Sequence, residues 1–172
     1  MVTTASSSRN VSEDKRVLFV CTGNLCRSPI AVGFMKELLK AQGHEEEYEV
    51  TSAGTWTVED HPPAPLGVEV MAERGVDISS HRSHRLTPQN IEDADLVVVM
   101  TQGHKESLAL EFPPAKEKIY LLAELAGKSH DIDDPYGSDS LELYRHCADE
   151  IENLLREGYP RLIELLEGQE KG

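Results

Sequence analysis

A cysteine, an arginine and a serine stand close together in the stretch VLFVCTGNLCRSPIA, residues 17–31. Cys21 and Arg27 enclose five residues, and Ser28 directly follows the arginine. A cysteine thiolate is a nucleophile, and the planar guanidinium of arginine matches two oxygens of a phosphate. These residue types at this spacing indicate attack of sulfur on phosphorus in a site that binds an oxyanion.

The setting of this loop also favours anion binding. The apolar run 17–20 is typical of a buried strand, and a helix is predicted to begin near Pro29. The first N–H groups of a helix have no intrahelical partner and carry the positive end of its dipole, so they attract an anion. Gly23 permits a backbone with positive φ, and Asn24 tolerates the left-handed region. We therefore expect the loop to curve around a phosphate.

Expulsion of an alkoxide or phenoxide needs a proton donor, and the acidic segment DIDDPYG offers Asp131, Asp133 and Asp134. The alternative is a solvated acidic turn. A calcium-binding loop of the EF-hand type is rejected, because Pro135 and Tyr136 fall where that loop requires an oxygen ligand and a turn glycine. His81 and His84 have no further metal ligands near them in the sequence, so hydrogen-bonding histidines and no metal are predicted.

Composition limits the class of protein. A length of 172 residues suits one domain. The net charge of −14 argues against a nucleic-acid or anionic-membrane partner. No apolar run approaches the roughly 20 residues that span a bilayer, and no secretory signal is visible. Cys21, Cys26 and Cys147 are too few for a disulfide framework, so a cytoplasmic location is predicted.

Strands that alternate with helices predict an α/β fold whose parallel sheet is covered on both faces. Residues 1–15 are expected to be a disordered tail, and residues 16–168 a single domain. Ligands bind beyond the carboxyl ends of such strands, which is where the Cys21 loop lies. Residues 140–166 have helical character, and Pro160 is expected to bend or split that helix. Strands are predicted at 17–20, 48–52, 95–100 and 118–122, and further helices at 29–42 and 66–74, from Thr87, and from Thr101 to Leu110.

The motif VCTGNLCRSPIA, together with Asp134-Pro135-Tyr136, resembles the low-molecular-weight protein tyrosine phosphatase family over residues 16–166. The resemblance implies a three-layer α/β/α fold with a four-stranded parallel sheet of order 2-1-3-4 and a phosphate-binding loop after strand 1. It also implies a cysteinyl-phosphate intermediate, no cofactor, and a monomer or weak dimer. By position, Cys21 is the nucleophile, Arg27 the phosphate clamp, and Asp134 the general acid and later base. Asp133 stays an alternative general acid, because only the match to the Asp-Pro pattern favours Asp134 over it.

The resemblance further implies supporting roles. Ser28 donates to the sulfur, and Asn24 holds the loop in a strained shape with support from Ser52 and His81. Cys26 matches a second loop cysteine that can form a protective disulfide with the nucleophile. A small apolar filler is the alternative role for Cys26. The substrate-binding residues predicted in this way are Thr22, Gly23, Asn24, Leu25, Cys26, Ser28, Trp56 and Tyr136.

The predicted substrate follows from positions at which this sequence differs from other members of the family. Gly137 follows Tyr136, whereas eukaryotic members often carry two aromatics there, so Trp56 is a candidate for the second aromatic wall. The patterns MTQGHK and DPYGS resemble the bacterial branch, which also contains protein-arginine phosphatases that typically have threonine at the Leu25 position. Leucine offers an apolar edge to a phenyl ring. A phosphotyrosine-containing protein or a small aryl phosphate is therefore the predicted substrate.

Two other functions use the same residues. A thioredoxin-coupled arsenate reductase shares this fold and loop, but its chemistry needs a further cysteine pair that Cys147 alone cannot supply. A phosphate-binding module without turnover is the other alternative. The joint presence of Cys21, Arg27 and Asp134 speaks against it.

Overall fold

The structure, a computed structural model, describes residues 14–168 and contains one sheet of parallel strands in the order β2-β1-β3-β4. The predicted four-stranded sheet and its order are confirmed. Residues 1–13 of the predicted tail lie outside the described residues, but Lys15, also assigned to that tail, pairs with Tyr48 in the sheet. The predicted boundary after Lys15 is therefore wrong by one residue. The strands are β1 (Lys15–Cys21), β2 (Tyr48–Gly54), β3 (Leu96–Val99) and β4 (Ile119–Leu121).

Burial of the strands follows from their composition. In β1, residues 17–20 are at most 3% exposed, and all of β3 is fully buried. Continuous apolar runs of this kind suit central strands with helices on both faces. The first part of β2 instead alternates buried and exposed residues, because β2 lies at an edge of the sheet. Because β1 is an inner strand, its carboxyl end lies between the carboxyl ends of β2 and β3.

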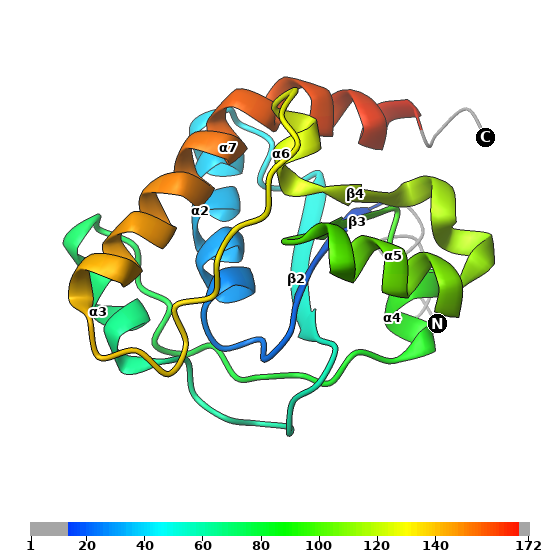
Figure 1. The fold of residues 1–172 in the computed structure, drawn as a ribbon. Helices are drawn as coiled ribbons and strands as arrows, with labels where there is room; N and C mark the ends of the chain where they lie inside the picture. Colours follow the sequence, from blue (N-terminus) through cyan, green and yellow to red (C-terminus); the bar gives the residue numbers. More distant parts are fainter. Residues whose placement is uncertain (1–13, 169–172) are drawn as a thin grey trace, which may run out of the picture.

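The helices form a layer on each face of the sheet, which gives the predicted α/β/α sandwich (Figure 1). Helices α2, α3 and α7 pack together on one side, and α4 and α5 lie on the other. A short 3₁₀ helix, η1, and α6 flank β4 and were not predicted from the sequence. The helices are α2 (Arg27–Ala41), α3 (Pro65–Glu73), α4 (Pro88–Asp93), α5 (Gln102–Glu111), η1 (Pro113–Lys118), α6 (Leu122–Leu125) and α7 (Leu141–Gly168).

Local signals set several helix ends. Gly43 and Gly75 adopt φ values of +75° and +78° just beyond α2 and α3, a conformation that favours glycine. Thr101 caps α5, since its hydroxyl accepts a hydrogen bond of 3.0 Å from the backbone N–H of His104. Thr87 caps α4 in the same way. These starts and stops agree with the sequence predictions.

The long helix α7 is continuous, so of the two outcomes predicted for Pro160, a bend or a split, the split does not occur. Figure 1 shows that the helix changes direction over its C-terminal part, as a proline inside a helix produces. Pro160 lies on the exposed side, where water can satisfy the carbonyl that its ring leaves without a partner. Within residues 14–168, neither α7 nor any other helix is long and apolar enough to cross a membrane.

The contact between α6 and α7 depends on the absence of a side chain at Gly158. A Cβ atom at this position would lie 2.8 Å from Cβ of Leu125 and 3.0 Å from its backbone carbon. We predict that Gly158→Ala lowers the free energy of unfolding by roughly 1–3 kcal/mol, because the helices must separate. Urea unfolding measures this change. The matched control on the same helix is Gly168→Ala, where nothing lies within 4 Å; an equal effect of the two variants would contradict the packing argument.

Candidate functional site

A cavity of about 390 Å³ opens at the carboxyl edge of the sheet, where the loop 22–26 joins β1 to α2. Cys21 is the last residue of β1, and Arg27 is the first residue of α2, two positions earlier than the predicted helix start. The N-terminus of α2 is therefore directed at the cavity and favours an anion there. The cavity is lined by Cys21, Thr22, Gly23, Leu25, Cys26, Trp56, Thr57, Val58, His61, Asp134 and Tyr136.

Asn24 determines the shape of the loop. Its φ of +59° lies in the left-handed region, whereas the predicted positive φ at Gly23 does not occur. A non-glycine residue keeps this conformation only when its surroundings hold it there. The fully buried side chain of Asn24 donates from Nδ2 to Oγ of Ser28 at 2.7 Å and to Oγ of Ser52 at 2.9 Å. Its backbone N–H points at Sγ of Cys21 at 3.3 Å.

The segment 81–84 holds the other side of Asn24. Nε2 of His81 donates to the backbone carbonyl of Asn24 at 2.8 Å, and burial lowers the pKa of His81, which favours the neutral ring. The backbone N–H of His84 donates to Oδ1 of Asn24 at 2.8 Å. Ser52 and His81, the two residues predicted to support the loop, thus both contact Asn24. The backbone donor at His84 could not be read from the sequence, because it depends on the course of a distant segment.

The hydroxyl of Ser28 has one available hydrogen, and the surrounding bonds decide where it points. Asn24 donates to this oxygen, so the Ser28 hydrogen is free to be given to Sγ of Cys21, which lies 3.0 Å away. A hydroxyl donor stabilises a thiolate more than a thiol. The sulfur therefore has two hydrogen-bond donors directed at it, the Ser28 hydroxyl and the backbone N–H of Asn24.

Arg27 is almost completely buried, at 4% exposure, and its guanidinium is fixed on one side. Nη1 donates to the carbonyl of Ile132 at 2.8 Å, and Nη2 lies 3.3 Å from Oδ2 of Asp134 and 3.5 Å from Oγ1 of Thr22. Within residues 14–168, Nε has no hydrogen-bond partner. Nε and Nη2 form one edge of the guanidinium, and this edge can donate two parallel hydrogen bonds to the oxygens of an oxyanion.

The three acidic candidates have different positions. Asp134 lines the cavity, and its Oδ1 accepts the backbone N–H of Tyr136 at 3.1 Å. Asp131 instead accepts the backbone N–H of Gln102 at 2.8 Å, at the start of α5. Asp133 is exposed and is not among the residues that line the cavity. The geometry favours Asp134 over its neighbour as the acid.

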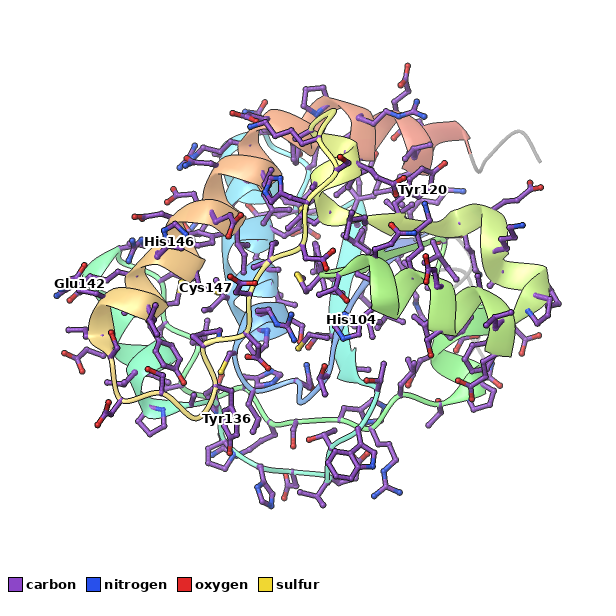
Figure 2. All side chains as sticks on the ribbon, in the orientation of Figure 1. His104, Tyr120, Tyr136, Glu142, His146 and Cys147 are labelled. Carbon is purple, nitrogen blue, oxygen red and sulfur yellow. The ribbon has the colours of Figure 1, made fainter. Side chains whose placement is uncertain are left out.

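Two aromatic side chains stand at the rim of the cavity. Trp56 is 85% exposed and Tyr136 is 60% exposed, and both line the cavity with Leu25. Figure 2 shows Tyr136 on the loop that precedes α7. The backbone N–H groups of residues 55 and 56 donate to the carbonyls of Cys21 and Thr22, each at 2.9 Å, so the Trp56 loop is tied to the phosphate loop. The two walls predicted from the sequence therefore lie on the same cavity.

The second loop cysteine is buried and protonated. Sγ of Cys26 donates to the hydroxyl of Tyr144 at 3.7 Å, and burial raises the pKa of Cys26 to about 12. All three cysteines are free thiols in this structure. Cys147 lies on the inner face of α7, and burial raises its pKa to about 12 as well. The disulfide between Cys21 and Cys26 stays a prediction.

His104 belongs to the site and was not recognised in the sequence. It projects from the first turn of α5 toward the interior (Figure 2), where Nε2 lies 2.9 Å from Oγ1 of Thr22. Burial and the nearby charge of Arg27 lower the pKa of His104 to about 4, so the ring is neutral at pH 7. The sequence contained one signal for this residue. A helix was predicted to start at Thr101, directly after β3, and β3 lies next to β1 in the sheet, so the start of that helix lies near the Cys21 loop.

In the described part of the chain, no group of three or more His, Cys, Asp or Glu residues is placed to bind a metal.

Comparison with known proteins places this geometry in context. Residues 16–167 match the family "low molecular weight phosphotyrosine protein phosphatase". A protein-arginine-phosphatase of Geobacillus stearothermophilus is 38% identical over 90% of this chain and 98% of its own length. Arsenate reductase 2 of Staphylococcus saprophyticus is 35% identical over 68% of this chain and 83% of that protein. The crystal structure of the low molecular weight protein tyrosine phosphatase from T. tengcongensis is 41% identical, with a TM-score of 0.79 over 88% of this chain and 99% of that one.

The lowered pKa of His104 predicts a pH dependence of stability. The folded-state pKa of about 4 lies below the ordinary histidine value of 6.5, so the unfolded chain binds this proton first as the pH falls. The contribution to stability is complete above about pH 6.5 and is lost progressively toward pH 4. We predict that His104→Gln loses less unfolding free energy between pH 7 and pH 4.5 than the wild type, as measured by urea unfolding. His146→Gln, at an exposed site on α7, should keep the wild-type slope; identical slopes for all three proteins would refute the assignment.

Proposed function

This chain belongs to the low molecular weight phosphotyrosine protein phosphatase family, hydrolases that act on phosphoric monoesters, and we propose that it hydrolyses phosphotyrosine through a covalent phosphate on Cys21. The observation that carries this proposal is the buried Arg27, whose Nε has no hydrogen-bond partner within residues 14–168 and whose Nη2 lies 3.3 Å from Asp134, a residue that lines the same cavity as Cys21. A fixed cation and a hydrogen-bonded thiolate at a helix N-terminus suit a reaction in which two anions must meet.

In the first step, the phosphate binds between the backbone N–H groups of the loop and the free edge of Arg27, and the Cys21 thiolate attacks phosphorus. A bond forms between sulfur and phosphorus, and the bond from phosphorus to the tyrosine oxygen breaks. Ser28 and Asn24 hold the sulfur in place through the contacts of 3.0 and 3.3 Å. The negative charge that builds on the phosphoryl oxygens is stabilised by groups that are already in position.

Asp134 supplies the proton for the departing phenoxide. Before substrate binds, its carboxylate lies 3.3 Å from Nη2 of Arg27, a nitrogen that the phosphate also needs. Binding of the phosphate therefore replaces Asp134 as the partner of Arg27 and adds a negative charge nearby. Asp134 is then released from Arg27, and in its carboxylic acid form it can donate to the leaving oxygen.

In the second step, water attacks the phosphate on Cys21. Asp134, now a carboxylate, accepts a proton from that water, and the bond between phosphorus and sulfur breaks. The sulfur leaves as a thiolate, which the hydrogen of the Ser28 hydroxyl stabilises. Inorganic phosphate is released, and the site returns to its starting state.

The lining of the cavity supports an aryl phosphate ester over a guanidinium that carries phosphate on nitrogen. Leu25, Trp56 and Tyr136 offer apolar surface to a flat ring, and Asp134 is the one carboxylate among the residues that line the cavity. A phosphoarginine substrate needs acceptors for the N–H groups of its guanidinium. Protein-arginine phosphatase activity is nevertheless the second candidate, because a relative 38% identical over 90% of this chain carries that name.

Arsenate reduction is the third candidate, and the cysteines argue against it. Apart from the two loop cysteines, the chain contains only Cys147, which is buried at 3% exposure and protonated. Resolution of a sulfur–arsenic adduct by a further exchangeable pair is therefore not available on this chain. Hydrolysis requires only Cys21, Arg27 and Asp134.

Replacement of the proposed nucleophile and acid has distinct expected effects. Cys21→Ser should abolish the hydrolysis of p-nitrophenyl phosphate at neutral pH, since a protonated serine hydroxyl is a poor nucleophile. Asp134→Ala should lower kcat by about 10²–10⁴-fold for phosphotyrosine and less for p-nitrophenyl phosphate, whose leaving group needs less protonation. Asp133→Ala is the matched control and should change kcat little. Steady-state kinetics with both esters measures these effects, and a larger loss in Asp133→Ala would reassign the acid.

The identity of the ester can be tested at Leu25. We expect the wild type to have a higher kcat/KM for a phosphotyrosine peptide than for the same peptide with phosphoarginine. Leu25→Thr should shift that ratio toward phosphoarginine, because a hydroxyl near the scissile bond can accept from a guanidinium. A preference of the wild type for phosphoarginine would replace the proposed substrate with the second candidate.

A further inference from the structure

A second hollow of about 520 Å³ adjoins the substrate cavity on the far side of the Trp56 loop. Trp56, Thr57 and Val58 line both spaces, and Thr55 and Arg85 complete the second. The 85% exposed indole of Trp56 therefore forms a wall shared by the two spaces. Exposed tryptophans are frequent anchors in protein recognition, and a peptide that enters the first space passes beside the second.

The backbone around this hollow is held firmly in place. The N–H of Gly54, at the end of β2, donates to the carbonyl of His84 at 2.8 Å, and its carbonyl accepts the N–H of Leu86 at 2.9 Å. Arg85 thus pairs with Gly54 at the edge of the sheet. A Cβ atom at Gly54 would lie 2.7 Å from the carbonyl oxygen of Thr22, so the sheet edge and the phosphate loop are in direct contact. The position of the Arg85 backbone is fixed relative to the reacting sulfur.

The guanidinium of Arg85 is oriented, and Arg85 lowers the pKa of the Glu59 carboxyl through the hydrogen bond from its backbone N–H and, to a lesser extent, through its charge. Its Nε donates to the carbonyl of Thr57 at 3.1 Å, which directs the side chain along the hollow. The nearest acid, Glu59, uses its two oxygens for the backbone N–H of Arg85 at 2.6 Å and for Nδ1 of His84 at 3.2 Å. Among the residues that the structure describes, no carboxylate lies within 4.0 Å of the Arg85 side-chain nitrogens. The terminal nitrogens can therefore receive a carboxylate from another molecule.

We propose that this hollow is a specificity subsite that receives an acidic side chain of the phosphoprotein substrate, next to the phosphorylated residue. The aliphatic stem of a glutamate packs against Trp56, and its carboxylate pairs with Arg85. This inference rests on the proposed function, because it assumes a phosphorylated residue in the neighbouring cavity. Long-range repulsion from a chain of net charge −14 is screened beyond about 8 Å at physiological salt, so the short-range pair decides the preference.

The experiment uses phosphotyrosine peptides in which each of the three positions on either side of the phosphorylated residue is glutamate, alanine or lysine. A parallel set carries phosphoarginine. We expect the wild type to prefer glutamate to lysine by about 3- to 5-fold in kcat/KM at one or two positions, the size of an exposed ion pair. Arg85→Ala should remove this preference, and Arg85→Glu should reverse it. Both variants should hydrolyse p-nitrophenyl phosphate at the wild-type rate, since it has no flanking residues.

Binding provides a readout that does not depend on turnover. Trp56 is the single tryptophan of the chain and lines both spaces, so its fluorescence in a Cys21→Ser background gives the affinity of each peptide for the combined site. The matched control is Arg82→Ala, which removes a charge from the same exposed segment and should keep the preference for glutamate. Equal binding of glutamate and lysine peptides, or the same loss in Arg82→Ala and Arg85→Ala, would overturn the subsite. Failure of the wild type to hydrolyse either phosphorylated residue would instead overturn the proposed function.

Discussion

The left-handed conformation of Asn24 is the constraint on which the site depends. A residue with a Cβ atom resists this conformation, and here it is held by hydrogen bonds at its side-chain amide nitrogen, its amide oxygen and its backbone carbonyl. The reversal of the chain at this residue brings the first turn of α2 under the loop and aims the backbone N–H of Asn24 at the sulfur. The side chain of Ser28 is oriented by the same amide. Without this reversal, the cysteine, the arginine and the helix terminus could not face one space.

The acid reaches that space by a different route. Asp134 comes from a segment more than 100 positions further along the chain, and the segment is anchored where Arg27 donates to the carbonyl of Ile132 at 2.8 Å. Ile132 is itself almost fully buried, at 1% exposure, and its N–H donates to the carbonyl of Met100 at 3.0 Å. Arg27, the proposed phosphate clamp, therefore also anchors the segment that carries the proposed acid. Burial of the guanidinium is tolerable because its nitrogens are paired with protein groups or available to an oxyanion.

The sequence was sufficient where the information is local. The apolar runs predicted the strands, the threonine caps predicted helix starts, and the spacing of Cys21, Arg27 and Ser28 indicated one loop. It was insufficient where a contact depends on strand order or on backbone groups: the bond between His104 and Thr22, the carbonyl of Ile132, and the role of Asp131 at α5. Pro160 was predicted to bend or split its helix, and the helix bends without breaking because the apolar face of α7 packs on both sides of the proline.

The residues at the rim come from three separate segments, and the hydrogen bonds that hold the loop do not involve the side chains of Leu25, Trp56 or Tyr136. A substitution at any of them changes the shape of the entrance and leaves the arrangement around the sulfur intact. Lineages can therefore acquire new substrates by exchanging rim residues one at a time, with no intermediate that has lost its chemistry. This mutational independence provides a physical reason why relatives that are 38% and 41% identical to this chain over the aligned residues carry the names of phosphatases with different substrates.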